Sequence, residues 1–228
     1  MRVGHNRTVR FYEEKVIGQM TRVDIHSILA GKWEDGTRPK DLYKTHILEN
    51  PLVYLNDIIQ GLGFQERRVQ SGCAELAALL SEDAPNLLYP HAELFISNLE
   101  AKAPVLRWEA VCTLGNISSV DKLEKTPKLI KRFTNFLGDK SIVLQGHSVR
   151  ALTKIAKAFP ETSSDILEAL LAHTDYFPGN RIGFIVEAME PFVGNPKFVS
   201  KVRRFVEPFL ESDIKSVVKK ARKVMKSL

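Results

Sequence analysis

Residues 105–115 read Val105-Leu106-Arg107-Trp108-Glu109-Ala110-Val111-Cys112-Thr113-Leu114-Gly115, and they decide the fold because their pattern returns along the chain. Apolar residues lie four before, four after and seven after Ala110, at Leu106, Leu114 and Ile117. Those offsets share one face of an α-helix, because 3.6 residues complete each turn. The stretch therefore predicts an amphipathic helix with the small residue Ala110 at the middle of its buried face.

The same pattern recurs at intervals of 36 to 38 residues. The positions equivalent to Ala110 are Cys73, Ser148, Ile185 and Ala221. Each of these helices is preceded by another apolar stripe at helical spacing, so each period holds two helices, and no alternating strand pattern competes. One helix pair cannot bury its stripe alone, so each pair must stack on the next. The sequence therefore predicts an all-α solenoid.

The period and the stretch at 105–115 resemble the HEAT-repeat family of armadillo-like helical repeats. The resemblance covers residues 50–228 and implies a right-handed α-α superhelix of about five helix pairs. It says little about function, because such repeats serve many unrelated roles. The family often has arginine after the apolar residue that begins the second helix, and the corresponding residues here are Gln70, Arg107, Gln145, Ile182 and Val218. Only Arg107 keeps that pattern, so the sequence does not predict the family's usual polar ladder between repeats.

We expect two parts in the chain. Residues 1–49 are predicted to form an N-terminal helical cap, with a helix around 11–29, followed by a turn-rich loop at 31–39 that is either mobile or a folded lid. Residues 50–228 are predicted to be the repeat domain. Its repeats are expected at approximately 50–83, 84–121, 126–161, 163–195 and 198–228.

Composition favours a globular protein of the cytoplasm. Hydrophobic residues make up 44% of the chain and charged residues 26%, and no run approaches the ~20 apolar residues that a membrane-spanning helix needs. The positively charged N-terminus lacks the apolar run of a secretory leader. Cys73 and Cys112 lie in apolar helical contexts, which predicts buried free thiols in a reducing compartment.

The sequence predicts no catalytic residue, cofactor or metal. The histidines show no zinc-type spacing with one another or with the cysteines; they are His5, His26, His46, His91, His147 and His173. There is no serine elbow or lysine-bearing phosphate loop, and Gly61-Leu62-Gly63 lacks the third glycine of a dinucleotide site. We therefore predict that the protein is not an enzyme but an adaptor or scaffold for a protein partner.

The concave face of the solenoid is the expected contact surface. Second helices line this face in such stacks, and their basic residues are Arg68, Arg107, Arg150, Lys154 and Arg181. These side chains either form a positive stripe or pair with Glu66, Glu109 and Glu187. The two alternatives remain open from the sequence.

The C-terminal end offers a second candidate surface. Residues 201–228 hold nine basic and three acidic residues, and a helical wheel separates Lys215, Lys219, Arg222, Lys223 and Lys226 from the apolar face. This basic face is either a solvated cap or a contact for phosphates or an acidic partner. Oligomeric state stays open, as does a role as a subunit of a larger assembly.

Trp108 supports an alternative function. Small helical-repeat DNA glycosylases resemble this chain in size and repeat type, and they hold damaged DNA with aromatic and acidic residues on the concave face. Arg107-Trp108-Glu109 is a partial match to their clustered tryptophans and aspartates. The alternative is therefore a nucleic-acid-binding or base-excision protein, and the competing interpretation is a tryptophan half-buried between repeats.

Overall fold

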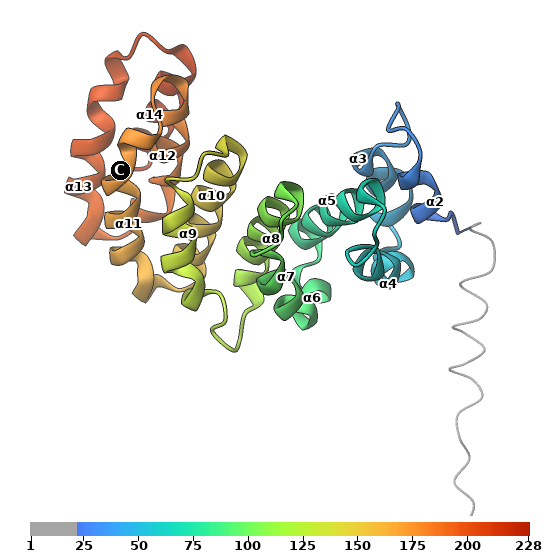
Figure 1. Cartoon of the computed structure of the whole chain (residues 1–228). Coiled ribbons are helices and arrows are strands. Elements are labelled where there is room, and N and C mark those ends of the chain that lie inside the picture. Colours follow the sequence, from blue (N-terminus) through green and yellow to red (C-terminus); the bar gives the residue numbers. More distant parts are fainter. Residues whose placement is uncertain (1–21) are drawn as a thin grey trace, which may run out of the picture.

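The computed structural model describes residues 22–228, which form helices, turns and loops with no strand among them (Figure 1). The helices before the repeats are α2 (Ile25–Ala30) and α3 (Pro39–Leu42), and α3 continues into a π-helical turn at Tyr43–Ile47. The first helices of the pairs are α4 (Pro51–Gly61), α7 (Ala92–Asn98), α9 (Ile130–Phe136), α11 (Ser163–Ala172) and α13 (Pro196–Val206). The second helices are α5 (Arg67–Asp83), α8 (Pro104–Ile117), α10 (Ile142–Ala158), α12 (Ile182–Ala188) and α14 (Lys215–Lys226). A short helix, α6 (Pro85–Leu88), precedes α7.

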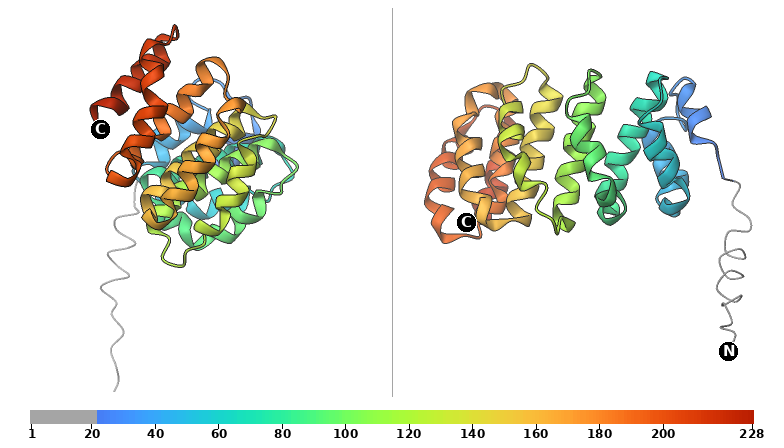
Figure 2. Two further views of the ribbon diagram at one scale, coloured as in Figure 1. Left: turned by 90° about the vertical axis from the view of Figure 1, so that its left-hand side faces the viewer. Right: turned by 60° about the horizontal axis from the view of Figure 1, so that its bottom comes forward.

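Five helix pairs stack into the predicted solenoid. Each second helix packs on the next, so α5 contacts α8, α8 contacts α10, α10 contacts α12 and α12 contacts α14. The pairs follow one another along an arc, and the second helices lie on its inner side (Figures 1 and 2). The all-α superhelix of about five pairs with an N-terminal helical cap is confirmed.

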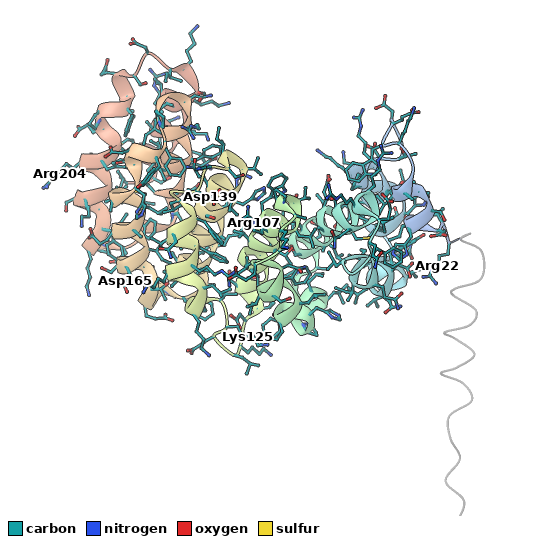
Figure 3. All side chains as sticks on the ribbon, viewed as in Figure 1. Arg22, Arg107, Lys125, Asp139, Asp165 and Arg204 are labelled. Carbon is teal, nitrogen blue, oxygen red and sulfur yellow. The ribbon has the colours of Figure 1, made fainter. Side chains whose placement is uncertain are left out.

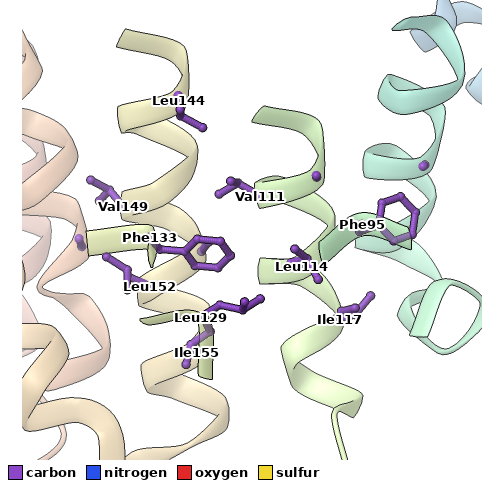
Figure 4. Packing of buried hydrophobic residues seen from close by; sticks show 14 of the residues in the cluster. Phe95, Val111, Leu114, Ile117, Leu129, Phe133, Leu144, Val149, Leu152 and Ile155 are labelled. Atoms are coloured by element: carbon purple, nitrogen blue, oxygen red, sulfur yellow. The ribbon is translucent and has the colours of Figure 1, made fainter. Parts of the chain in front are cut away.

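The positions equivalent to Ala110, which we call the central ladder positions, are all buried. Cys73, Ser148, Ile185 and Ala221 are 0% exposed and Ala110 is 2% exposed. The polar member, Ser148, is satisfied because its hydroxyl donates to the Leu144 carbonyl oxygen at 2.8 Å. The core runs without a break from Ile25 to Val224. Figure 4 shows its middle, where Phe133 and Leu114 lie between neighbouring pairs.

Helix starts are set by proline and by capping side chains. Pro51, Pro85, Pro104 and Pro196 each begin a helix, where the missing N–H removes no helical hydrogen bond. Besides Asp24, three side chains accept a backbone N–H as N-caps. They are Glu66 for α5, Ser141 for α10 and Asn195 for α13.

The helix predicted around 11–29 is confirmed at residues 25–29 and wrong at residues 22–24. Its residues 11–21 lie outside the described residues. Among the others, α2 begins only at Ile25, because the Asp24 carboxylate accepts the backbone N–H groups of His26 and Ser27 at 3.0 and 3.2 Å. An N-cap of this kind starts a new helix. The boundary between cap and repeats at residue 50 stays a prediction.

The 31–39 loop is a folded turn. The Thr37 hydroxyl donates to the Lys32 and Glu34 carbonyl oxygens, and the Trp33 indole N–H donates to the Leu29 carbonyl oxygen at 3.0 Å. Gly36 has a φ of +86°, a conformation that favours glycine. These contacts give the loop a defined turn, and its role as a lid stays a prediction.

Ion pairs join neighbouring repeats at two places in the stack. Lys125 pairs with Glu93 at 2.7 Å, and Arg132 with Glu100. Lys201 pairs with Glu168, and all three pairs span 32 or 33 residues. Such partly exposed pairs contribute about 0 to 1 kcal/mol each. They fix the register of the stack more than its stability.

Candidate functional site

One position of each second helix recurs along the inner surface of the stack. Two residues after each central ladder position lie Glu75, Cys112, Arg150, Glu187 and Lys223. The charge along this series changes from acidic on α5 to basic on α10, then acidic on α12 and basic on α14. The inner face is therefore not a continuous positive stripe.

A polar network joins three successive second helices. The Asn116 amide on α8 donates to the Ser81 hydroxyl of α5 at 2.7 Å. Its oxygen accepts from the Lys154 ammonium of α10, and Lys154 also lies 3.8 Å from the Glu82 carboxylate. Asn116 is 6% exposed. This network holds α5, α8 and α10 in register where the sequence predicted no polar ladder.

The main groove of the inner surface lies between α10 and α12. It encloses about 710 Å³ and extends to the start of α13. The α10 wall contributes Arg150, Lys154 and Lys157, and Phe184 and Phe198 supply its aromatic side chains. The guanidinium carbon of Arg150 lies 5.7 Å from the Phe184 ring centroid. The groove thus combines cations with aromatic surface.

A second, smaller groove of about 450 Å³ lies on the neighbouring repeat. Its lining includes the hydroxyl-bearing residues Ser81, Ser118 and Ser119 together with Asn116. Lys154 and Lys157 line both grooves. The two grooves therefore meet at α10 and follow the C-terminal halves of α8, α10 and α12.

The carboxylates of the main groove are already paired. Glu187 accepts from Lys220 at 2.8 Å, and Glu190 from Lys223 at 2.9 Å. Across the groove, Arg150 and Lys157 form no ion pair with any residue between 22 and 228. The groove consequently has an excess of available positive charge.

The inner surface of α5 and α8 has the opposite character. The Trp108 indole N–H donates to the Glu109 carboxylate at 3.1 Å. Burial, together with the nearby Glu75 carboxylate, raises the pKa of Glu109 to about 7. On α10, burial lowers the pKa of His147 to about 4, with the charges of Arg150 and Lys154 acting in the same direction.

Replacing Glu109 by glutamine is expected to stabilise the protein above neutral pH. The folded-state pKa of about 7 lies above the ordinary value of 4.5 for a glutamate. The stability that protonated Glu109 contributes is therefore fully present below pH ~4.5 and is lost as pH rises through ~7. After allowance for partial exposure, Glu109→Gln should gain about 1 kcal/mol at pH 8 and almost nothing at pH 5. Urea unfolding at both pH values measures this, with the exposed Glu161→Gln as control. An equal gain at both pH values would contradict the assignment.

The predicted site residues fall into three groups. Arg150 and Lys154 lie together in the main groove. Arg68 and Arg181 are tied within the stack, to the Gly31 carbonyl oxygen at 2.7 Å and to the Gln145 amide oxygen at 3.1 Å. Arg107 and Trp108 are half-buried on α8, at the middle of the stack (Figure 3). Within residues 22–228, none of the predicted pairings with Glu66, Glu109 or Glu187 forms; Glu187 pairs with Lys220 instead.

The structure divides the basic residues of α14 between two faces. Lys220 and Lys223 point to α12, where they pair with Glu187 and Glu190. Lys215, Lys219, Arg222 and Lys226 are exposed and form no ion pair within residues 22–228. The apolar face of α14 packs on α12 as well as on α13.

Sequence reasoning missed Lys157 and Phe184. Lys157 lies seven residues after Arg150, on the same helical face, so helical periodicity could have found it. Phe184 gave no signal, because an apolar residue inside an apolar helix is typical of core. Only the neighbouring repeats place it in the groove wall.

The described residues contain neither a metal-binding cluster nor a membrane-spanning helix. No group of three or more histidine, cysteine, aspartate or glutamate side chains there could hold a metal ion. No helix in the same part of the chain is long and apolar enough to cross a membrane. Both cysteines are free thiols.

Comparison with known proteins shows the fold. The chain is similar to a crystal structure of an engineered protein, with a TM-score of 0.62 and 14% identity over 90% of this chain and 98% of that one. It is similar to a designed armadillo repeat protein, with a TM-score of 0.59 and 16% identity over 90% of this chain and 100% of that one. A third similar structure, of computationally designed armadillo repeat proteins for modular peptide recognition, has a TM-score of 0.59 and 16% identity over 90% of each chain. No family model and no curated protein matches.

Proposed function

We propose that this armadillo-like solenoid is a non-catalytic scaffold that holds an extended segment of a partner protein along its concave face. The observation that carries the proposal is the pair of adjoining grooves that meet at Lys154 and Lys157. They cross the second helices of successive repeats, and an extended chain advances about 3.3 Å per residue. A short peptide can therefore follow the grooves from α8 to α12.

The chemistry of the main groove favours an acidic and apolar segment. Arg150 and Lys157 are available cations, whereas Glu187 and Glu190 are occupied by Lys220 and Lys223. A carboxylate of the partner would gain charge-assisted hydrogen bonds from the free cations. Apolar side chains of the partner would bury surface against Phe184 and Phe198. Such aromatic anchors dominate many binding interfaces.

One of the comparisons supports a binding role. One similar solved structure is of armadillo repeat proteins designed for peptide recognition. Two free cysteines are consistent with an intracellular, reducing location, which is part of the proposal. The alternative, a nucleic-acid-binding or base-excision protein, remains a prediction from Trp108 and the basic C-terminal end.

Reversal of the two free groove cations is expected to weaken peptide binding at least tenfold. The probe is a fluorescent peptide of about ten residues that alternates glutamate and leucine, and its counterparts carry lysine or serine in place of glutamate. The parent protein should bind the glutamate peptide best in fluorescence anisotropy. Arg150→Glu with Lys157→Glu should lose that binding, because two attractive charges become repulsive.

The control variant is Lys128→Glu with Lys131→Glu, which makes the same change in net charge on exposed residues of the first-helix layer. It should bind like the parent. Binding of the lysine or serine peptide in place of the glutamate peptide would reject the acidic preference. Failure of all three peptides to bind would reject the groove as a peptide site.

A further inference from the structure

The exposed basic residues of α14 form one straight stripe. Lys215, Lys219, Arg222 and Lys226 are spaced by four, three and four residues, which places them on one helical face over about 16 Å. All four are exposed, and none pairs with an acidic residue among 22–228. The helical wheel groups Lys223 with these residues, but in the structure Lys223 pairs with Glu190 and is not part of the set. We call these four residues the α14 stripe.

Local stability explains only part of the α14 stripe, because Lys226 alone of the four lies in the last turn, where the helix dipole favours cations. Helix α14 has six lysine and arginine residues and no aspartate or glutamate. Lys215 lies in its first turn, where the helix dipole favours acidic side chains and disfavours cations. Like charges at a spacing of four also repel. A capping surface that served solubility alone would gain from a mixture of positive and negative side chains. The charged side chains of α14 are all positive, which points to a polyanionic ligand.

The residues around the stripe indicate which kind of polyanion it contacts. Within residues 177–228 no large apolar side chain is exposed, whereas protein interfaces and membrane-bound helices both need apolar surface. Binding of single strands uses exposed aromatic rings for base stacking, and the last helix pair exposes none. A duplex presents phosphates at high density and needs only cations for sequence-independent contact. Arg204, which projects from the outer side of α13, adds to the positive charge of this end (Figure 3).

We infer that the α14 stripe binds the phosphate backbone of double-stranded nucleic acid without sequence preference. This surface is separate from the peptide groove and goes beyond the proposed function. Four phosphate contacts predict that the logarithm of the binding constant falls with the logarithm of salt concentration with a slope of about −3.6. Affinity should therefore fall about a hundredfold between 50 and 200 mM salt.

The test measures binding of the full chain to a labelled random-sequence DNA duplex of about 20 base pairs across a salt series. Lys219→Ala with Arg222→Ala should make the slope shallower by about 1.8, so that the same salt change weakens binding only about tenfold. Both side chains are exposed, so the variant should keep the circular dichroism and melting temperature of the parent. The matched control is Arg150→Ala with Lys157→Ala, which removes two free cations from the groove.

A shallower slope in the stripe variant alone supports the inference. The inference is overturned by equal slopes in both variants, or by no duplex binding at 50 mM salt. It is also overturned if a single strand of the same sequence binds as tightly as the duplex, or if vesicles of anionic lipid bind and the duplex does not. None of these outcomes depends on whether the groove binds a peptide.

Discussion

Ala110→Asp is expected to unfold a large fraction of the protein, with a loss of about 4 kcal/mol in the free energy of unfolding. Ala110 is 2% exposed and lies at the centre of the ladder on α8. That helix contacts α5 on one side and α10 on the other. A carboxylate there would be buried without a partner, and the cost of burying an unpaired charge is several kcal/mol.

Thermal unfolding followed by circular dichroism measures this effect, and the melting temperature should fall by about 10 °C or more. The control is Ala172→Asp, which introduces the same carboxylate at an exposed position at the end of α11. It should cost less than about 1 kcal/mol. If Ala110→Asp melted like the control, α8 would not be packed between its neighbours as the structure has it.

Alanine substitution of two glycines in neighbouring second helices is expected to give opposite results. A Cβ on Gly115 of α8 would lie 2.8 Å from the Ala151 Cα and 2.9 Å from its Cβ. Backbone atoms of α10 cannot move away without shifting the helix, so Gly115→Ala should cost about 2 kcal/mol. A Cβ on Gly146 of α10 would meet only the Phe184 ring, at 3.7 Å. Gly146→Ala should therefore stabilise by about 1 kcal/mol, the helix propensity of alanine over glycine.

Urea denaturation of the two variants and the parent measures both changes. Because the substitution is identical and both positions are helical, the propensity term is common to both. The two changes in the free energy of unfolding should differ by about 3 kcal/mol, and this difference measures the steric cost of the close approach of α8 to α10. A stabilising effect at both glycines would show that the helices are not in contact at Gly115 and Ala151.

The correct sequence predictions rest on helical periodicity. The ladder from Cys73 to Ala221 predicted the second helices, and every central position is buried. The N-terminal helix was wrong at residues 22–24 because apolar residues such as Val23 and Ile28 continue the helical spacing through Asp24. A capping carboxylate interrupts a helix without disturbing that pattern. The polar network at Asn116 was missed because its partners, Ser81 and Lys154, lie in other repeats.

The candidate site was only partly predictable for the same reason. Arg150 and Lys154 were chosen as polar residues of a second helix, and they lie in the groove. Arg68 and Arg181 were chosen on the same grounds, but they are hydrogen-bonded within the stack. A helical wheel shows which face a residue occupies. It does not show what the next helix places opposite that residue.

The sequence alone determined the helix pairs, their stacking and the separation of basic from apolar residues on the last helix. Each of these depends on spacing within one helix or on a repeat of that spacing, and such information is local. Tertiary structure alone decided which cations are free. Lys220 and Lys223 are neutralised by Glu187 and Glu190, 33 residues earlier, whereas Arg150, Lys157 and the α14 stripe are not. Side chains one repeat apart come within hydrogen-bonding distance only after the stack has formed, because the curvature of the solenoid sets their separation.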